Sequence, residues 1–224
     1  MCEFFSFCTD EYGMKYYFNW EQRQAMKFEG QDSHDHIIAE YKLKDDKINC
    51  FEFNPLTRKF QVDKLNTIDN RIQAEEWVNK LDFKTVVAPL IIKPIINLLQ
   101  GRAKKPTPKQ IQSLKEWDSV RASVRDSVWA SVGASVWDSV LASVWDSVWA
   151  SVWASVRDSV RDSVRDSVWA YTSSFFTVEY KYDFTSAIKL WEAGFVPSFD
   201  GKTWRLHSGK SAKIIYEWQN MEAE

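Results

Sequence analysis

Two stretches near the N-terminus alternate apolar and polar residues on both sides of a short polar turn. EFFSFCT and KYYFNW flank residues 10–13, and INCFEFN and KFQVDKL flank residues 54–57. A period of two on either side of a turn-forming tetrapeptide is typical of a β-hairpin. The pattern therefore predicts two hairpins in this part of the chain.

Helical spacing is found in two further stretches of the same region. Asp32 and Ser33 are good N-cap residues, so a short helix is expected after them. The stretch IQAEEWVNKLDF places Ile72, Trp77, Val78 and Leu81 near one helical face. Hairpins and helices together predict a small α+β domain over residues 1–100.

The next stretch, residues 101–117, is rich in glycine, proline and lysine. Its charge pattern is typical of a solvated connection rather than a nucleic-acid contact. Thr107 is a good N-cap, and Pro108 suits the first position of a helix. We therefore expect a basic linker that ends in a helix entry.

A four-residue word fills residues 118–169. Each of its thirteen units has serine at the second position and valine at the third. The first position is Asp or Ala, and the fourth is Trp or Arg except at Gly133 and Leu141. This regularity defines a repeat segment over residues 118–170.

A period of four fits two different structures. In an α-helix four residues overshoot one turn by about 40°, so the valines wind around the helix and form no fixed apolar face. Ser, Val, Trp and Asp are also weak helix formers. In an extended chain all valines face one side, and stacked units would bury them as the core of a solenoid. We therefore favour a β-solenoid, with one long helix as the alternative because the helix entry runs into the repeat without a breaker.

The word is distantly similar to the pentapeptide repeat, which forms a quadrilateral β-helix with a central apolar residue on each face. Pentapeptide repeats have five residues per face and a small residue at the second inward position. Here that position is often Asp, and an unpaired buried Asp is costly. The resemblance therefore supports a solenoid only in part.

The C-terminal part, residues 171–224, repeats the mixed pattern of the first part. TSAIKLWEAG predicts a short helix capped by Gly194. FVPSFDGKTWRLH predicts a hairpin on the turn Asp200-Gly201, and AKIIYEW predicts a further strand. We expect a small α+β module, either a βαββ-like cap or a set of strands that completes the first sheet.

Several stretches along nearly the whole chain carry a resemblance. MCEFFSFCT, FEFNPLTRKFQVD, LDFKTVVAPLIIKPII, the [AD]SV[WRG] run and GFVPSFDGKTWRLHSGK resemble an uncharacterised family found largely in bacteriophage and environmental sequences. The resemblance implies a viral or mobile-element origin and expression in a bacterial cytoplasm. It implies no activity, catalytic residue or cofactor.

Composition and charge narrow the cellular setting. The 224 residues have a net charge of -2, so no strong field draws the chain to nucleic acid or to an anionic membrane. Three cysteines are too few for a disulfide framework, which indicates a reducing compartment. The N-terminus has no basic segment of a signal peptide, and VVAPLII at 86–92 is far short of the roughly 20 apolar residues that a membrane helix needs. We expect a cytoplasmic protein without membrane contact.

Tryptophans and arginines of the repeat are the candidate interaction surface. Tryptophan and arginine together can bind single-stranded nucleic acid. The repeat, however, has seven Asp and five Arg, and the resulting net negative charge repels phosphate. A row of exposed tryptophans is better explained as a contact with a protein partner or with a second copy of the chain. The surface comprises Trp129, Trp137, Trp145, Trp149, Trp153, Trp169, Arg121, Arg125, Arg157, Arg161 and Arg165.

Metal and catalytic chemistry find little support in the sequence. His34 and His36, with Cys2, Cys8 or Cys50, do not have the ligand spacing of a known zinc motif, and we interpret the histidines as surface residues. No nucleophile elbow, phosphate loop, dinucleotide fingerprint or HExxH motif occurs. We therefore expect no metal, cofactor or catalytic residue.

These observations predict a non-enzymatic structural or protein-interaction protein of phage origin. The alternative is a nucleic-acid-related role, either single-strand binding by the Trp and Arg residues or DNA mimicry of the pentapeptide-repeat kind.

Overall fold

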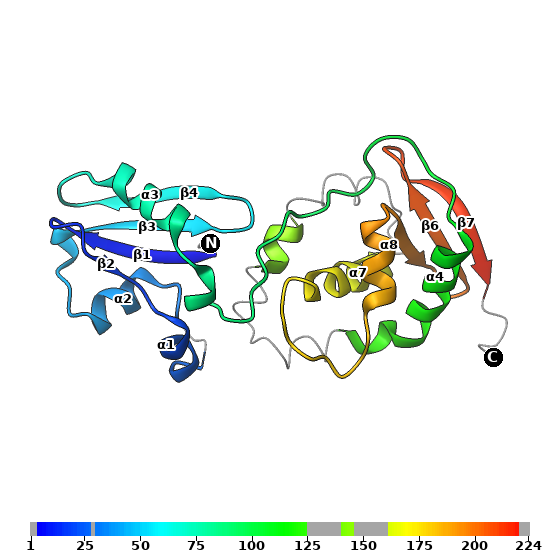
Figure 1. The fold of residues 1–224 in the computed structure, drawn as a ribbon, viewed down its shortest axis with the longest axis horizontal. Coiled ribbons are helices and arrows are strands. Elements are labelled where there is room, and N and C mark those ends of the chain that lie inside the picture. The colour runs from blue at the N-terminus through cyan, green and yellow to red at the C-terminus, as the bar shows by residue number, and fades with distance from the viewer. Residues whose placement is uncertain (1–3, 28–29, 125–139, 146–160, 220–224) are drawn as a thin grey trace. The chain divides into compact units, whose positions relative to one another are not determined.

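The computed structural model of the chain describes residues 4–27, 30–124, 140–145 and 161–219. These residues form helices and two antiparallel sheets, so the expected α+β class is confirmed (Figure 1). They divide into two compact units. The first holds the described residues up to Pro94 together with Val140, and the second holds the other described residues from Ile95 onward.

The first unit is built around a four-stranded antiparallel sheet with the strand order β2-β1-β3-β4. Both hairpins predicted from the alternating pattern are present, but the second strand of the first hairpin is only Lys15–Tyr16, and Trp20 of the predicted strand begins a helix. The elements in chain order are β1 (Phe5–Asp10), β2 (Lys15–Tyr16), α1 (Trp20–Ala25), α2 (His34–Glu40), a 3-10 turn (Asp45–Lys47), β3 (Ile48–Asn54), β4 (Lys59–Leu65), α3 (Arg71–Lys80) and a second 3-10 turn (Phe83–Thr85).

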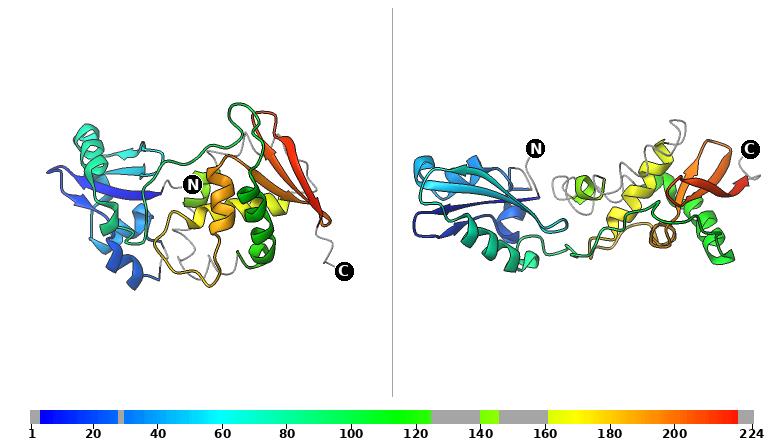
Figure 2. Two further views of the ribbon diagram at one scale, coloured as in Figure 1. Left: turned by 45° about the vertical axis from the view of Figure 1, so that its right-hand side comes forward. Right: turned by 90° about the horizontal axis from the view of Figure 1, so that it is seen from above.

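The two faces of this sheet bury different kinds of side chains. One face is aromatic: Phe7 packs against Phe51 and Trp77 with ring centroids 5.4 and 5.0 Å apart. The other face, under α2, contains a buried cluster that includes Cys8 and Cys50. Because alternate residues of a strand face opposite sides, Phe7 and Cys8 fall on different faces. The helices α2 and α3 therefore serve opposite sides of the sheet (Figure 2).

Helix α3 buries a narrower face than the sequence pattern predicts. Ala74 and Val78 are buried, as a helical stripe requires. Ile72, which we had placed on the same face, is 66% exposed. The prediction was wrong for Ile72, which lies in the first turn of the helix.

The second unit contains a three-stranded antiparallel sheet with the order β5-β6-β7. Its strands form a sheet of their own and do not complete the first sheet. Its elements include α4 (Pro108–Val120), a 3-10 turn (Arg121–Ser123), α7 (Arg161–Ser173), α8 (Thr185–Glu192), β5 (Val196–Phe199), β6 (Thr203–Ser208) and β7 (Lys213–Gln219).

The first part of the predicted basic linker is packed on the second unit. The carbonyl of Gly101 accepts a 3.2 Å hydrogen bond from the backbone of Lys210, and a Cβ at Gly209 would stand 2.5 Å from the backbone nitrogen of Ala103. A glycine with φ +74° is therefore required where these segments meet. This part of the chain is not a free connection.

The predicted helix entry is confirmed. Helix α4 begins at Pro108, and the hydroxyl of Thr107 accepts a hydrogen bond from the backbone of Gln110. The Gln110 side chain in turn accepts from the Thr107 backbone at 2.8 Å. Thr107 and Gln110 thus form a reciprocal capping box, which satisfies backbone donors that the first helical turn leaves free.

Where the structure describes the repeat, it is helical. Residues 118–120 end α4, residues 140–145 are helical, and residues 161–169 belong to α7. The preference for a β-solenoid was wrong for these stretches, and one continuous helix is also excluded for residues 118–124 because a 3-10 turn follows α4. Units at 125–139 and 146–160 lie outside the described residues.

Burial explains why weak helix formers are helical here. Val164 and Val168 of α7 are both buried and are separated by one unit. One unit rotates the valine stripe by only about 40°, so both side chains of a short helix can reach the same core. Packing then outweighs the unfavourable propensity, which costs at most about 0.7 kcal/mol per residue. None of the helices in the described stretches is long and apolar enough to cross a membrane.

Candidate functional site

Two positions of the repeat word face inward and two face outward in the helical stretches 140–145 and 163–169. The serine and valine positions are buried there, and the first and fourth positions are partly or fully exposed. The buried set is Val140, Ser143, Val144, Ser163, Val164, Ser167 and Val168, and the outward set is Leu141, Ala142, Trp145, Arg165, Asp166 and Trp169.

Three side chains of the predicted interaction surface lie in this outward set. Arg165 is exposed, and its guanidinium lies 5.8 Å from the ring centroid of the partly buried Trp169. Trp145 is also partly exposed. Arg161 begins α7. The predicted surface residues Arg125, Trp129, Trp137, Trp149, Trp153 and Arg157 lie outside the described residues.

Arg121 was predicted for the same surface, but it works inside the second unit. Its guanidinium forms a 2.7 Å ion pair with Asp166, which lies 45 residues away in the last unit of the repeat. The same group lies over the rings of Phe199 and Trp204, at 5.5 and 5.9 Å from their centroids. Arg121 therefore connects the two ends of the repeat to the C-terminal sheet.

Described serines of the repeat bind backbone groups. The hydroxyl of Ser163 accepts from the backbone N–H of Phe199 at 2.8 Å and lies 3.3 Å from the carbonyl of the same residue. Phe199 ends β5, an edge strand, so Ser163 satisfies backbone groups that a neighbouring strand would otherwise bind. Ser167 donates to the carbonyl of Val164 at 2.7 Å within α7. These serines are structural.

A Ser–His hydrogen bond occurs elsewhere, in the C-terminal sheet. Ser198 of β5 lies 2.7 Å from Nε2 of His207 on β6, and Nδ1 of His207 lies 3.0 Å from the carbonyl of Ala212. Nδ1 must donate to that carbonyl, so Nε2 accepts from the Ser198 hydroxyl. In many enzymes such a bond joins a serine nucleophile to its histidine base. Here, however, Ser198 is fully buried, and the other ring nitrogen is bound by a backbone carbonyl instead of a carboxylate. The pair holds the two strands together.

His207 should make the second unit acid-sensitive. Burial lowers the pKa of His207, so the unfolded chain binds a proton at a higher pH than the folded chain. The free energy of unfolding should therefore decrease as the pH falls from about 6.5 toward the folded-state pKa. Urea titrations between about pH 5 and 8 would measure this slope. It should flatten in His207→Gln and persist in a variant of an exposed histidine, His36→Gln; an unchanged slope in His207→Gln would contradict the assignment.

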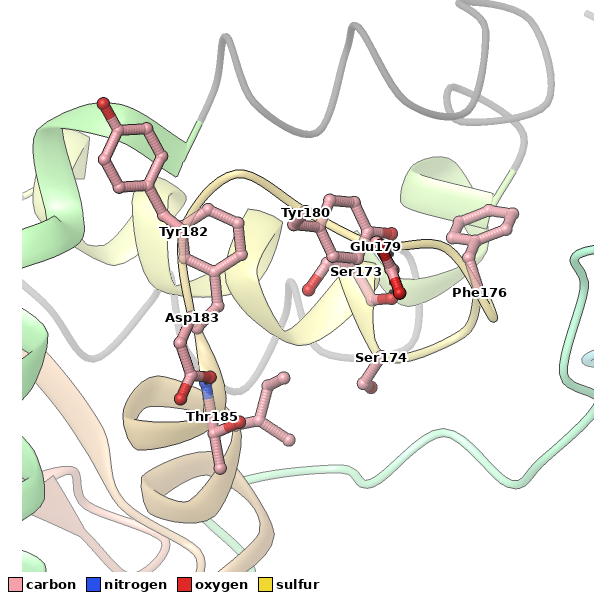
Figure 3. A pocket seen from close by; sticks show the side chains of 10 residues that line it. Ser173, Ser174, Phe176, Glu179, Tyr180, Tyr182, Asp183 and Thr185 are labelled. Carbon is pink, nitrogen blue, oxygen red and sulfur yellow. Dashed lines mark hydrogen bonds between the residues drawn. The ribbon is translucent and has the colours of Figure 1, made fainter.

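A hollow of about 440 Å³ lies where α7 ends and α8 begins (Figure 3). Most of its polar groups already serve the fold. Tyr180 donates to the carbonyl of Ser173 at 3.1 Å, and burial raises the pKa of the Tyr180 phenol. The carboxylate of Asp183 accepts from the backbone of Thr185 at 2.8 Å. The described lining pairs no base with a nucleophile, so the hollow carries no evident chemistry.

A larger hollow of about 990 Å³ lies in the first unit beside α1 and α2. Its lining includes Phe18, Met26, His36 and Lys42. His36 is exposed, as predicted, and its Nδ1 lies 3.1 Å from the carbonyl of Gly30. The mixed lining is open to solvent on the outer side of the helices.

Two cysteines and a histidine meet under α2. Cys8 of β1 is directly opposite Cys50 of β3 in the strand register, and their sulfurs are 3.4 Å apart. His34 begins α2, and one of its ring nitrogens lies within 4.8 Å of both sulfurs. All three residues are buried, so the prediction that His34 is a surface residue was wrong.

The two thiols share one hydrogen bond. That bond raises the pKa of Cys8 and holds the pKa of Cys50 below its ordinary value. His34 is fixed on both sides: Nε2 lies 3.1 Å from the carbonyl of Phe51, and Nδ1 lies 3.2 Å from a carboxylate oxygen of Asp63. Two sulfurs and a ring nitrogen are thus gathered around one point of the sheet, with a carboxylate beside the ring.

A buried ion pair lies in the same unit. The guanidinium of Arg23 contacts both carboxylate oxygens of Asp32 at 2.7 and 3.3 Å, and its Nε donates to the carbonyl of Phe18 at 3.0 Å. Burial raises the pKa of Asp32, against the opposing effect of Arg23. Asp32 was predicted as a helix cap, but its carboxylate instead neutralises a fully buried arginine.

Comparisons with protein-family models, with curated proteins and with solved structures gave no match.

Proposed function

We propose that the chain is a non-enzymatic structural or protein-interaction protein of phage origin, and that the fourth position of its repeat forms the contact surface. The observation that supports this proposal is that different positions of the repeat word differ in burial. In the helical stretches 140–145 and 163–169, Ser and Val are buried in the fold, and the fourth position, which holds Leu141, Trp145, Arg165 and Trp169, faces outward. A word that repeats this arrangement presents many copies of the same side chains.

A protein contact fits these side chains better than a nucleic-acid contact. Arg121 is neutralised by Asp166 and covered by two aromatic rings, so it does not offer its charge to a phosphate. Arg165, although exposed, lies beside Trp169 in a repeat whose net charge is negative. Tryptophan contributes most where it buries a large apolar area against a partner. We propose a second copy of the chain as the first partner to test.

Replacement of Trp145, Trp149 and Trp153 by Ser should weaken self-association at least about tenfold, because tryptophans are frequent binding hot spots worth about 2 kcal/mol or more. Sedimentation equilibrium of the full chain would measure the effect. The matched control replaces Arg157 and Arg165 by Gln and should leave the association constant nearly unchanged. A wild-type chain that stays monomeric at every concentration would contradict self-association.

The same variants test the nucleic-acid alternative. Fluorescence anisotropy with a labelled single-stranded oligonucleotide should detect no binding at physiological salt. If the wild type binds and the arginine variant has a log–log salt dependence flatter by about 0.7 per lost contact, the nucleic-acid role replaces our proposal.

A further inference from the structure

We propose that Cys8, His34, Cys50 and Asp63 form a zinc site in the first unit. The four residues come from four different elements, β1, α2, β3 and β4. The ligand atoms of Cys8, His34 and Cys50 converge under α2, and the carboxylate of Asp63 lies beside the His34 ring. Thiolate and imidazole together are the ligand set that zinc prefers in proteins. The site does not involve the repeat, so it stands independently of the function proposed above.

The distance between the two sulfurs and the distance between His34 and Asp63 are close to those around a tetrahedral ion. Zinc–sulfur bonds of about 2.3 Å and zinc–nitrogen or zinc–oxygen bonds of about 2.0 Å place neighbouring ligands about 3.8 and about 3.3 Å apart. The two sulfurs are 3.4 Å apart, and Nδ1 of His34 is 3.2 Å from Asp63. The sulfurs need to separate by only a few tenths of an ångström. The three buried ligand atoms already lie within 4.8 Å of one another.

The hydrogen bonding of His34 leaves one nitrogen for the metal. The carbonyl of Phe51 only accepts, so Nε2 carries the proton and Nδ1 has the lone pair. Nδ1 faces a carboxylate, which also accepts, and a cation between them satisfies both groups. A backbone carbonyl that orients a metal-binding histidine through its other nitrogen is the usual outer partner at such sites.

An irregularity in the sheet brings Asp63 to this position. Cys50 pairs with Lys64 on β4, but Phe51 pairs with Val62, so Asp63 is an extra residue in the ladder. Such a bulge redirects the side chain of the extra residue. The side chain of Asp63 is 41% exposed, whereas the other three ligands are buried, so it also marks the side from which an ion can enter.

Zinc explains this cluster better than a disulfide does. A bond between Cys8 and Cys50 would use the two sulfurs, but it gives no role to a buried histidine and a carboxylate at the same point. It would also require an external oxidant. Metal binding needs only the loss of the thiol protons to solvent, and it would tie α2 to three strands of the sheet.

The full chain, reduced and freed of metal by a chelator, would be titrated with Co²⁺ and with Zn²⁺. We expect one ion per chain, the visible bands of tetrahedral cobalt together with thiolate-to-cobalt charge-transfer absorption, and a higher melting temperature with Zn²⁺. Affinity should fall as the pH is lowered, because the ligands must lose protons. The double variant Cys8→Ser/Cys50→Ser should lose the charge-transfer absorption and the zinc-induced rise in melting temperature.

The variant Asp63→Asn tests the proposal even if variants of the buried ligands do not fold, because the side chain of Asp63 reaches solvent and its replacement should not disturb the core. It should bind zinc about tenfold to 100-fold more weakly. Cys2→Ser and His36→Gln are the matched controls and should bind as the wild type does. The proposal is overturned if the folded wild type shows no charge-transfer absorption, if the double cysteine variant takes up the same amount of metal, or if the two cysteines prove to be joined in a metal-free disulfide.

Discussion

Arg23→Met should destabilise the first unit by about 3–5 kcal/mol, because it leaves the carboxylate of Asp32 buried without its partner. The side chain of Arg23 is 1% exposed, and methionine is apolar and of similar length, so the change removes the charge with little change of shape. Urea unfolding monitored by circular dichroism would measure the loss. The deficit should shrink at acidic pH, where Asp32 can take up a proton in place of its lost partner.

Arg71→Met is the matched control. Arg71 forms an equally close ion pair with Asp69, at 2.6 Å, but both side chains are about half exposed. Exposed pairs contribute about 0–1 kcal/mol, so this variant should unfold almost as the wild type does. Arg23→Met/Asp32→Asn should recover much of the lost stability because it also removes the isolated charge. Equal effects of the two single variants would show that the burial of Arg23 has no energetic weight.

Val164→Asp should destabilise the second unit by about 3–5 kcal/mol. Val164 is buried on the inward side of α7, where a carboxylate would lose its hydration. Aspartate occurs seven times in the repeat, always at the first position of the word. The variant therefore tests whether a residue's position within the word, rather than its type, decides what the fold tolerates.

Arg165→Asp provides the comparison at the neighbouring residue. Arg165 is exposed, so the change should cost about 1 kcal/mol or less, mainly through the lost contact with Trp169. Thermal and urea unfolding of both variants would settle the difference. A Val164→Asp variant as stable as Arg165→Asp would mean that the valine position is not part of the core.

Local patterns in the sequence were sufficient to predict the turns of the hairpins. The turn at 54–57 forms because the side chain of Asn54 accepts from the backbone of Leu56 and Thr57 at 3.0 and 3.2 Å. Asp200 does the same for Lys202 and Thr203 at 3.0 and 2.8 Å. Such turns are decided by neighbouring residues, so a sequence pattern can identify them.

Helix α1 was missed although its signal is also local. Asn19 and Gln22 form a capping box, an arrangement that the sequence shows as a polar pair three residues apart. The helix has only six residues, too few for an apolar stripe to be recognised. Capping residues would therefore have been the better guide here than periodicity.

The repeat and the cysteine cluster could not be predicted from local patterns. Propensity favoured strands for the word, but burial of Val164 and Val168 decides the structure of α7. Cys8 and Cys50 are 42 residues apart and become neighbours only through the register of β1 and β3. A pattern can show that a strand exists, but it cannot show which residue will stand opposite which.

The ion pair between Arg121 and Asp166 bears on how the number of repeat units can change over time. It holds the first and last units together in the same compact unit, through a contact to which none of the units between them contributes. Copies of the word can therefore be gained or lost in the middle of the array, as slippage of a repetitive gene would cause, while the anchoring contacts at its ends stay intact.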